Sequence, residues 1–168
     1  MLFRSILAAL TLGLLSTPAL ADMYEPVTLA PVTHSDGTLA VIDASGAEVR
    51  YTPADLEQLD TYRMRTRTPW RDVPTEFDGV LLSDLLARHG LIDQSQIQII
   101  AENDFVSSMP KSLWESVNVL IATRADGRPL SRRERGPILF VIHEDEFAAS
   151  PQATEAHLVW MAARIEAE

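Results

Sequence analysis

Short runs of alternating or β-branched residues, separated by turn residues, predict strands along most of the chain. In the first third, Ser-Asp-Gly and Ala-Ser-Gly interrupt these runs. The expected strands cover residues 27–32, 38–42, 48–52, 61–68, 75–80, 96–100, 118–123, 138–143 and 157–167. Within 61–68 the residues Arg63, Arg65 and Arg67 share one face, so this face is expected to be basic and solvent-exposed.

Helix signals are fewer and predict only short helices. Thr52 is a good capping residue, Pro53 suits the first helical position, and Asp55 lies in the first turn. Gly90 ends a second helical pattern. The expected helices cover residues 53–59, 82–89 and 110–115.

Turn and loop signals complete the fold class. Asp126-Gly127 is typical of a tight hairpin, and residues 143–156 are expected to form a surface loop. Many short strands with few helices, paired non-locally, predict a mixed α+β domain.

The first 21 residues have the pattern of a secretory signal peptide. Arg4 precedes an apolar run over residues 6–15, and Ala19-Leu20-Ala21 fits a cleavage site. The run is shorter than the ~20 apolar residues that span a bilayer, although an uncleaved anchor is the alternative. We expect residues 22–168 to form one exported, periplasmic domain.

Charge and cysteine content exclude several classes of function. The chain has 24 acidic and 14 basic residues, a net charge of −10, which disfavours nucleic acid and anionic lipid surfaces. It contains no cysteine, and hence no disulfide, thiolate ligand or cysteine nucleophile.

Enzyme signatures do not assemble. The four histidines show no metal-binding spacing, and the acidic run after His143 is expected to be solvated rather than to hold a hard cation. No nucleophile elbow and no glycine-rich phosphate loop occur. We therefore predict no catalytic residue and no metal ligand.

Two basic regions, the first of which contains a tryptophan, and one Asn-Asp pair remain as candidates. They are the segment from Arg63 through Thr68 and Trp70 to Arg71, the segment 132–137, and Asn103-Asp104 with Trp114 downstream. A carboxylate can accept two parallel hydrogen bonds from a ring N–H and an adjacent amine, tryptophan offers a flat face, and arginine can stack or donate. The set suits a 2-amino-4-oxo heterocycle such as a pterin or guanine. Surface ion pairs, a core tryptophan and an Asn-Asp turn are the alternative interpretation.

Four segments resemble, in this order, the molybdopterin-binding domain of the sulfite oxidase superfamily: "TPWRDVPTEFDGVLLSDLLARHGL", "AENDFVSSMPKSLWESVNVLIATRADGRPLS", "RRERGPILFVIH" and "HLVWMAARIE". The similarity covers about residues 62–166 and implies a mixed sheet or barrel domain that cradles a pterin. Enzymes of the superfamily bind molybdenum through a cysteine ahead of the "FDGVLLSDLL"-like segment. Here that stretch is "RTRTPW", and the hydroxyls of Thr66 or Thr68 are poor substitutes for a thiolate. The molybdenum cofactor is therefore not expected.

The cysteine-lacking, exported members of the superfamily are more similar still. Their best-understood type is a periplasmic regulator that holds a reduced tetrahydropterin without metal and contacts the periplasmic domain of an inner-membrane cyclic di-GMP enzyme. This resemblance implies a pocket formed by Trp70, Asn103, Asp104, Arg133 and Arg135. Asp104 would pair with the ring N3–H and 2-amino group, Trp70 would stack, and Arg133 or Arg135 would meet the 4-oxo group or side-chain hydroxyls.

Three further residues are weaker candidates for the same pocket. They are Thr68, Phe105, which stands where the family has Tyr, and Trp114, which is expected mainly to support the core. The function expected is pterin sensing with report to a GGDEF/EAL-type membrane protein. The alternatives are a molybdopterin-dependent oxidoreductase or electron-transfer accessory, and an interaction module that has lost its pocket.

Overall fold

The structure is a computed structural model that describes residues 23–168. The predicted signal peptide therefore lies outside the described residues. Within residues 23–168, no helix is long and apolar enough to cross a membrane.

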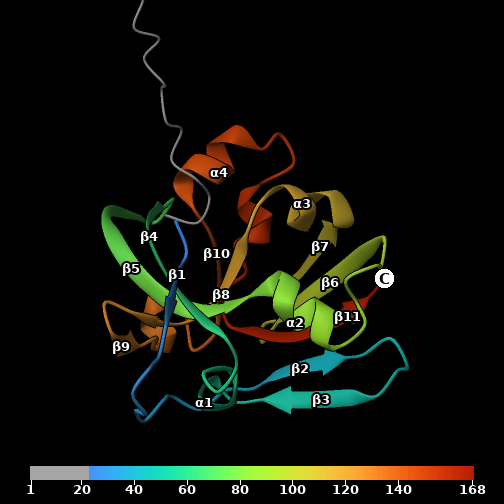
Figure 1. The fold of residues 1–168 in the computed structure, drawn as a ribbon, viewed down its shortest axis with the longest axis horizontal. Helices are drawn as coiled ribbons and strands as arrows, with labels where there is room; N and C mark the ends of the chain where they lie inside the picture. The colour runs from blue at the N-terminus through green and yellow to red at the C-terminus, as the bar shows by residue number, and fades with distance from the viewer. Residues whose placement is uncertain (1–22) are drawn as a thin grey trace, which may run out of the picture.

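Two β-sheets form the framework (Figure 1). The first sheet is antiparallel throughout and has the order β1-β4-β5-β8-β10, with β9 paired to β8. Its strands are β1 (Glu25–Val27), β4 (Thr61–Thr68), β5 (Arg71–Leu81), β8 (Val119–Ala125), β9 (Arg128–Pro129) and β10 (Leu139–Ile142).

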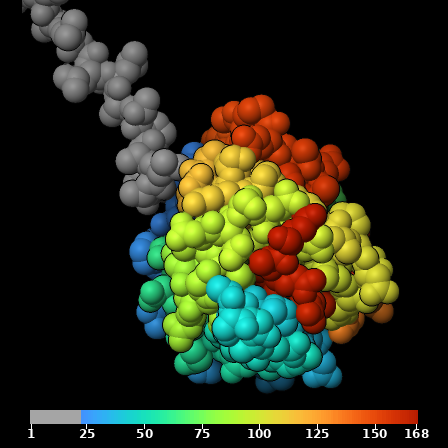
Figure 2. Space-filling model, turned by 90° about the vertical axis from the view of Figure 1, so that its right-hand side faces the viewer, coloured from blue at the N-terminus to red at the C-terminus, as the bar shows by residue number. Residues whose placement is uncertain are grey.

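The second sheet has the order β3-β2-β11-β6-β7 and is mixed, because β11 runs parallel to β2. Its strands are β2 (Leu39–Ile42), β3 (Glu48–Tyr51), β6 (Gln96–Ala101), β7 (Val106–Pro110) and β11 (Ala162–Ala167). In Figure 2 the end of the chain, in red, lies at the surface between the cyan and yellow segments, as expected for a strand between β2 and β6. The chain's last strand thus joins its first hairpin to the β6–β7 hairpin.

Short helices fill the connections. The α-helices are α1 (Pro53–Leu56), α2 (Leu82–Arg88), α3 (Lys111–Ser116) and α4 (Glu144–Ala149), and the 3₁₀-helices are η2 (Arg132–Glu134) and η3 (Glu155–His157). The predicted α+β class is confirmed. In the part of the chain that the structure describes, neither sheet closes into a barrel.

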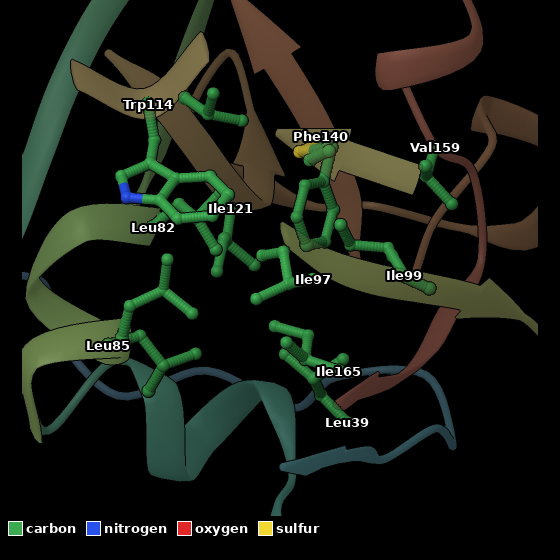
Figure 3. Close-up of a cluster of buried hydrophobic side chains, with 14 of the residues drawn as sticks. Leu39, Leu82, Leu85, Ile97, Ile99, Trp114, Ile121, Phe140, Val159 and Ile165 are labelled. Atoms are coloured by element: carbon green, nitrogen blue, oxygen red, sulfur yellow. The ribbon is translucent and has the colours of Figure 1, made fainter. Parts of the chain in front are cut away.

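The main hydrophobic core lies between the sheets, because its side chains come from strands of both and from α2 and α3 (Figure 3). Phe140 and Ile121 contribute from the first sheet, and Ile97 and Ile165 from the second; all four are fully buried. A smaller cluster around Met64 and Phe77 lies on the other face of the first sheet. Burial of this apolar surface is the dominant stabilising contribution in a chain that has no disulfide.

Several sequence predictions are confirmed in detail. The β4 strand covers the predicted residues 61–68, and Asp126 and Gly127 both have positive φ, 49° and 71°, as a tight hairpin requires. The basic face of β4 is largely neutralised: Arg63 donates two hydrogen bonds to Asp78, at 2.7 and 3.0 Å, and Arg67 lies 3.2 Å from Glu144. The interpretation of these arginines as ion-pair partners is therefore correct for two of the three.

Other element predictions are wrong. Residues 143–156 are not a loop throughout, because they contain α4 and the start of η3. The last strand begins at Ala162 rather than at residue 157, and β7 was not predicted. The first strand ends at Val27, where the predicted strand begins, so it is shifted toward the N-terminus. The first helix ends at Leu56 and is therefore shorter than the predicted 53–59.

The helix α4 forms where a loop was predicted because its Glu146 has partners in the protein interior. Glu146 is buried, and its carboxylate accepts hydrogen bonds from the Tyr24 hydroxyl at 2.5 Å and from the Asn118 side chain at 3.2 Å. Burial and the neighbouring Glu146 raise the pKa of Tyr24, so its hydroxyl stays protonated and can donate. The acidic run that suggested a solvated loop is thus partly directed inward.

Candidate ligand-binding site

An apolar cavity of about 210 Å³ opens beside the turn between β6 and β7. Three aromatic side chains contribute to its wall: Trp70, Phe105 and Trp160. Phe105 and Trp160 remain 45% and 41% exposed, so the cavity lies at the surface and is partly open. Its lining residues are Trp70, Ala101, Asn103, Phe105, Glu155, Leu158, Val159, Trp160 and Met161. A mostly apolar hollow with a few polar groups is the usual form of a small-molecule site.

Trp70 reaches the cavity from the tip of a hairpin. Thr68 of β4 pairs with Arg71 of β5, so Pro69 and Trp70 alone form the connection. The indole is half-buried and packs against both hydrophobic clusters. The hairpin thus fixes an aromatic wall with little freedom to move.

Arg135 packs against both Trp70 and Trp160. Its guanidinium carbon is 3.5 Å from the Trp160 ring centroid and 4.6 Å from that of Trp70, and the two indoles meet edge to face at 5.5 Å. The backbone carbonyl of Arg135 accepts a hydrogen bond from the Met161 N–H at 3.0 Å, and Arg135 has a φ of 71°. Burial lowers the pKa of Arg135, but a guanidinium remains charged at neutral pH. The Arg135 stack, formed by this guanidinium and the two indoles, therefore places a positive charge against two aromatic residues of the cavity wall.

The Asn103-Asp104 corner is a turn and a cavity wall at once. The Asp104 N–H donates to the Ala101 carbonyl at 3.1 Å, and Asp104 has a φ of 66°. The Asn103 side-chain oxygen accepts from the Phe105 N–H at 3.3 Å. Asn103 and Phe105 line the cavity, whereas Asp104 is exposed and is not part of the lining.

The other candidates lie elsewhere. Arg133 and Arg135 line a neighbouring hollow of about 230 Å³ on another side of Trp70. Trp114 is buried in the main core at 6% exposure. Thr68 is buried, has no hydrogen-bond partner for its hydroxyl in the described structure, and lines a third hollow beside Leu158. The structure thus brings Trp70, Asn103 and Phe105 together in the cavity lining. Arg135 contacts two tryptophans of that lining without belonging to it. The lining also excludes Thr68, Asp104, Trp114 and Arg133.

Trp160 and Glu155 were not predicted. Glu155 falls in residues 143–156, which were predicted to be a surface loop, and Trp160 falls in the apolar run of residues 157–167, which suggests one continuous strand. The chain instead turns at Met161, whose φ is 48° and whose carbonyl accepts from the Glu102 N–H at 2.9 Å. This turn exposes Trp160, and the sequence contains no glycine or asparagine there to signal it.

His157 fixes the stretch that contains Glu155. Its Nδ1 accepts a hydrogen bond from the Thr154 N–H at 3.1 Å, and the ring also hydrogen-bonds the Ser108 backbone. Nδ1 is an acceptor only in the neutral ring, so the proton is on Nε2. Burial lowers the pKa of His157, although the bond to Ser108 favours the cation. The neutral imidazole thus ties η3 to β7.

This arrangement predicts a stability loss in mild acid. Because the folded pKa of His157 lies below its unfolded value of ~6.5, the unfolded chain binds more protons, and stability falls as the pH drops below about 6.5. Urea unfolding at pH 7.5 and 5.5 should show a smaller loss for His157→Gln than for the natural protein. His89, whose pKa burial also lowers, is present in both proteins and cancels in this comparison. An equal loss in both proteins would remove His157 from this role.

The donor set does not fit molybdenum held by a thiolate. The sequence contains no cysteine, and the Thr66 hydroxyl is engaged as acceptor of the Glu144 N–H at 2.8 Å. Within residues 23–168, no three His, Cys, Asp or Glu side chains gather in a way that could hold a metal ion.

Comparison with solved structures defines the class of fold. The sulfane dehydrogenase SoxCD from Paracoccus pantotrophus contains a chain that matches with a TM-score of 0.61 and 17% identity, over 82% of this chain and 39% of that chain. The chain thus has a sulfite-oxidase-like fold and spans about two fifths of its neighbour's length. No protein-family model matches the sequence, and no curated protein matches it.

Proposed function

We propose that this chain is a periplasmic protein that binds a reduced pterin without metal and reports it to an inner-membrane cyclic di-GMP enzyme of the GGDEF/EAL type. The observation that favours pterin binding is the aromatic cavity. Trp70, Trp160 and Phe105 offer flat apolar surface, and Asn103 and Glu155 supply polar groups at its wall. This combination suits a flat, polar-edged heterocycle.

The Arg135 stack supports the same ligand. The 4-oxo group of a pterin is a carbonyl acceptor, and guanidinium groups donate to such oxygens. The neighbouring hollow adds Arg71 and Arg133 within reach of the same tryptophan. A tetrahydropterin side chain with hydroxyl groups would find donors there.

Reporting requires that the ligand changes a surface that the partner contacts. Phe105 and Trp160 line the cavity and are also exposed, so an occupied cavity alters the apolar surface around its mouth. Val106, 47% exposed, extends this surface along the start of β7. Exposed apolar side chains of this kind are typical of a protein contact.

The proposal predicts saturable binding of tetrahydropterin, measured by calorimetry under anaerobic conditions. Trp160→Ala should weaken binding about tenfold, because stacking of a base on an aromatic side chain contributes ~1–3 kcal/mol. Trp114→Phe is the matched control and should leave the affinity nearly unchanged, since Trp114 is in the core. Absence of binding to the natural protein would refute pterin binding.

A second readout tests the report to a partner. The periplasmic domain of a candidate membrane enzyme, immobilised on resin, should retain this protein to a different extent with and without tetrahydropterin. Retention that does not respond to the ligand, with binding confirmed by calorimetry, would refute signalling and leave a simple pterin carrier.

A further inference from the structure

Glu155 is the one charged side chain in the lining of the aromatic cavity. Its neighbours in that lining are aromatic or aliphatic apart from Asn103. Glu155 is an exposed residue, so its carboxylate can exchange water for hydrogen-bond donors of a ligand in the cavity, and hydrogen bonds to a charged group are stronger than neutral ones. It is therefore the charged group that a ligand in this cavity can reach.

The carboxylate is available for such a contact. In the described part of the chain, Glu155 has no ion-pair partner and no side-chain hydrogen bond, whereas Glu102 pairs with Arg132 and Glu134 with Ser131. The structure commits those neighbouring carboxylates to protein partners. It leaves Glu155 facing the cavity.

Its position is also fixed. The Glu155 carbonyl accepts from the Leu158 N–H at 3.1 Å, and His157 holds the same 3₁₀-turn through Thr154 and Ser108. A side chain mounted on an anchored turn loses less freedom on binding than one on a free loop. The backbone that carries the Glu155 side chain is therefore held in place.

Asp104 is less suited than Glu155 to contact a ligand in this cavity. It occupies the left-handed position of the β6–β7 turn and is absent from the cavity lining, although the residues on both sides of it belong to that lining. Asp tolerates this conformation better than most residues, which gives Asp104 a sufficient structural role.

We infer that Glu155, rather than Asp104, is the carboxylate that recognises the ligand, and that it selects rings with an N–H next to an exocyclic amine. A carboxylate accepts two parallel hydrogen bonds from this edge. A 2,4-dioxo ring presents a carbonyl in place of the amine and would set oxygen against oxygen. The inference rests on the proposed function and adds its specificity: 2-amino-4-oxo pteridines bind, and 2,4-dioxo pteridines do not bind well.

The test compares pterin with lumazine, which differs from pterin by a 2-oxo group in place of the amine, in matched redox states and by fluorescence titration. The natural protein should prefer pterin at least tenfold. Glu155→Gln should weaken pterin binding at least tenfold and abolish the preference, since an amide cannot accept both bonds. Glu115→Gln, a matched change on an exposed residue of α3 outside the cavity, should bind like the natural protein.

Each result has a defined meaning. A retained preference in Glu155→Gln would overturn the inference while leaving pterin binding intact. Loss of the preference in Asp104→Asn, with Glu155→Gln unaffected, would assign the role to Asp104. No binding of either ring to the natural protein would refute the proposed function itself. Equal thermal midpoints for all variants, expected for exposed positions, would exclude misfolding as the cause.

Discussion

Glu57→Ala is expected to lower the free energy of unfolding by about 3–5 kcal/mol, the range for removing one partner of a buried ion pair. Glu57 and Arg124 are both 5% exposed at their side chains and are joined by hydrogen bonds of 2.8 and 2.5 Å. The Thr123 hydroxyl donates to the same carboxylate at 2.7 Å, and His34 lies 3.1 Å from it. Without Glu57, the Arg124 guanidinium would remain buried and uncompensated.

The protonation of Glu57 follows the same logic. Burial opposes its ionisation, but the hydrogen bonds from Arg124, Thr123 and His34 outweigh burial and hold the pKa of Glu57 below its ordinary value. Arg124 also donates to the Ala30 carbonyl at 2.7 Å, so the pair anchors the segment between β1 and β2.

Urea unfolding at neutral pH measures the effect. The matched control is Arg50→Ala, which breaks an ion pair with Glu48 whose side chains are 62% and 34% exposed. Exposed pairs contribute about 0–1 kcal/mol, so this variant should be close to the natural protein. A loss below 1 kcal/mol for Glu57→Ala would show that the buried network is not a major source of stability.

Phe140→Ala is expected to reduce mainly the stability of the protein, whereas Phe105→Ala is expected to reduce mainly its affinity for the ligand. Phe140 is fully buried at the centre of the main core (Figure 3), and its truncation should cost about 3–5 kcal/mol through lost burial and a residual cavity. Phe105 is 45% exposed and belongs to the cavity wall, so its truncation should cost less than about 1 kcal/mol of stability. Only the second variant should weaken pterin binding directly.

Urea unfolding and pterin titration of both variants separate the two roles. Titration is done at a temperature where Phe140→Ala is still folded, as judged by circular dichroism. Similar stability losses in the two variants would contradict the exposure of Phe105. An unchanged pterin affinity in Phe105→Ala would exclude Phe105 from the site.

Local patterns predicted those parts of the fold where neighbouring residues determine the structure. Thr52 caps α1 through a reciprocal hydrogen-bond pair with Asp55, as its spacing suggests. The Asp126-Gly127 hairpin follows from residues that tolerate positive φ. The alternation of β4 places Met64, Thr66 and Thr68 on its buried side.

Long-range contacts decided the parts that could not be predicted. The helix α4 depends on Tyr24 and Asn118, which lie far away in sequence and satisfy Glu146. Likewise, β7 is a strand because β6 lies beside it, although its sequence includes two serines and a proline. No local pattern contains such partners.

The residues of the candidate site likewise include some that the sequence predicts and some that depend on long-range contacts. Trp70 and Asn103 could be found from the sequence because they are close to predicted turns and strand ends, and Phe105 from the resemblance to the family. Glu155 and Trp160 could not, because the turn at Met161 is held by Arg135 and Glu102 from other segments. A cavity wall that is assembled from three chain segments has no signature in any one of them.

The three tryptophans give this protein two separate optical reporters. Trp70 and Trp160 form part of the cavity wall, whereas Trp114 is enclosed by aliphatic side chains of the core. With the two outer indoles replaced by phenylalanine, the emission that remains follows unfolding alone. With only Trp114 replaced, the emission follows occupancy, so one spectrometer can follow folding and ligand capture in the same chain.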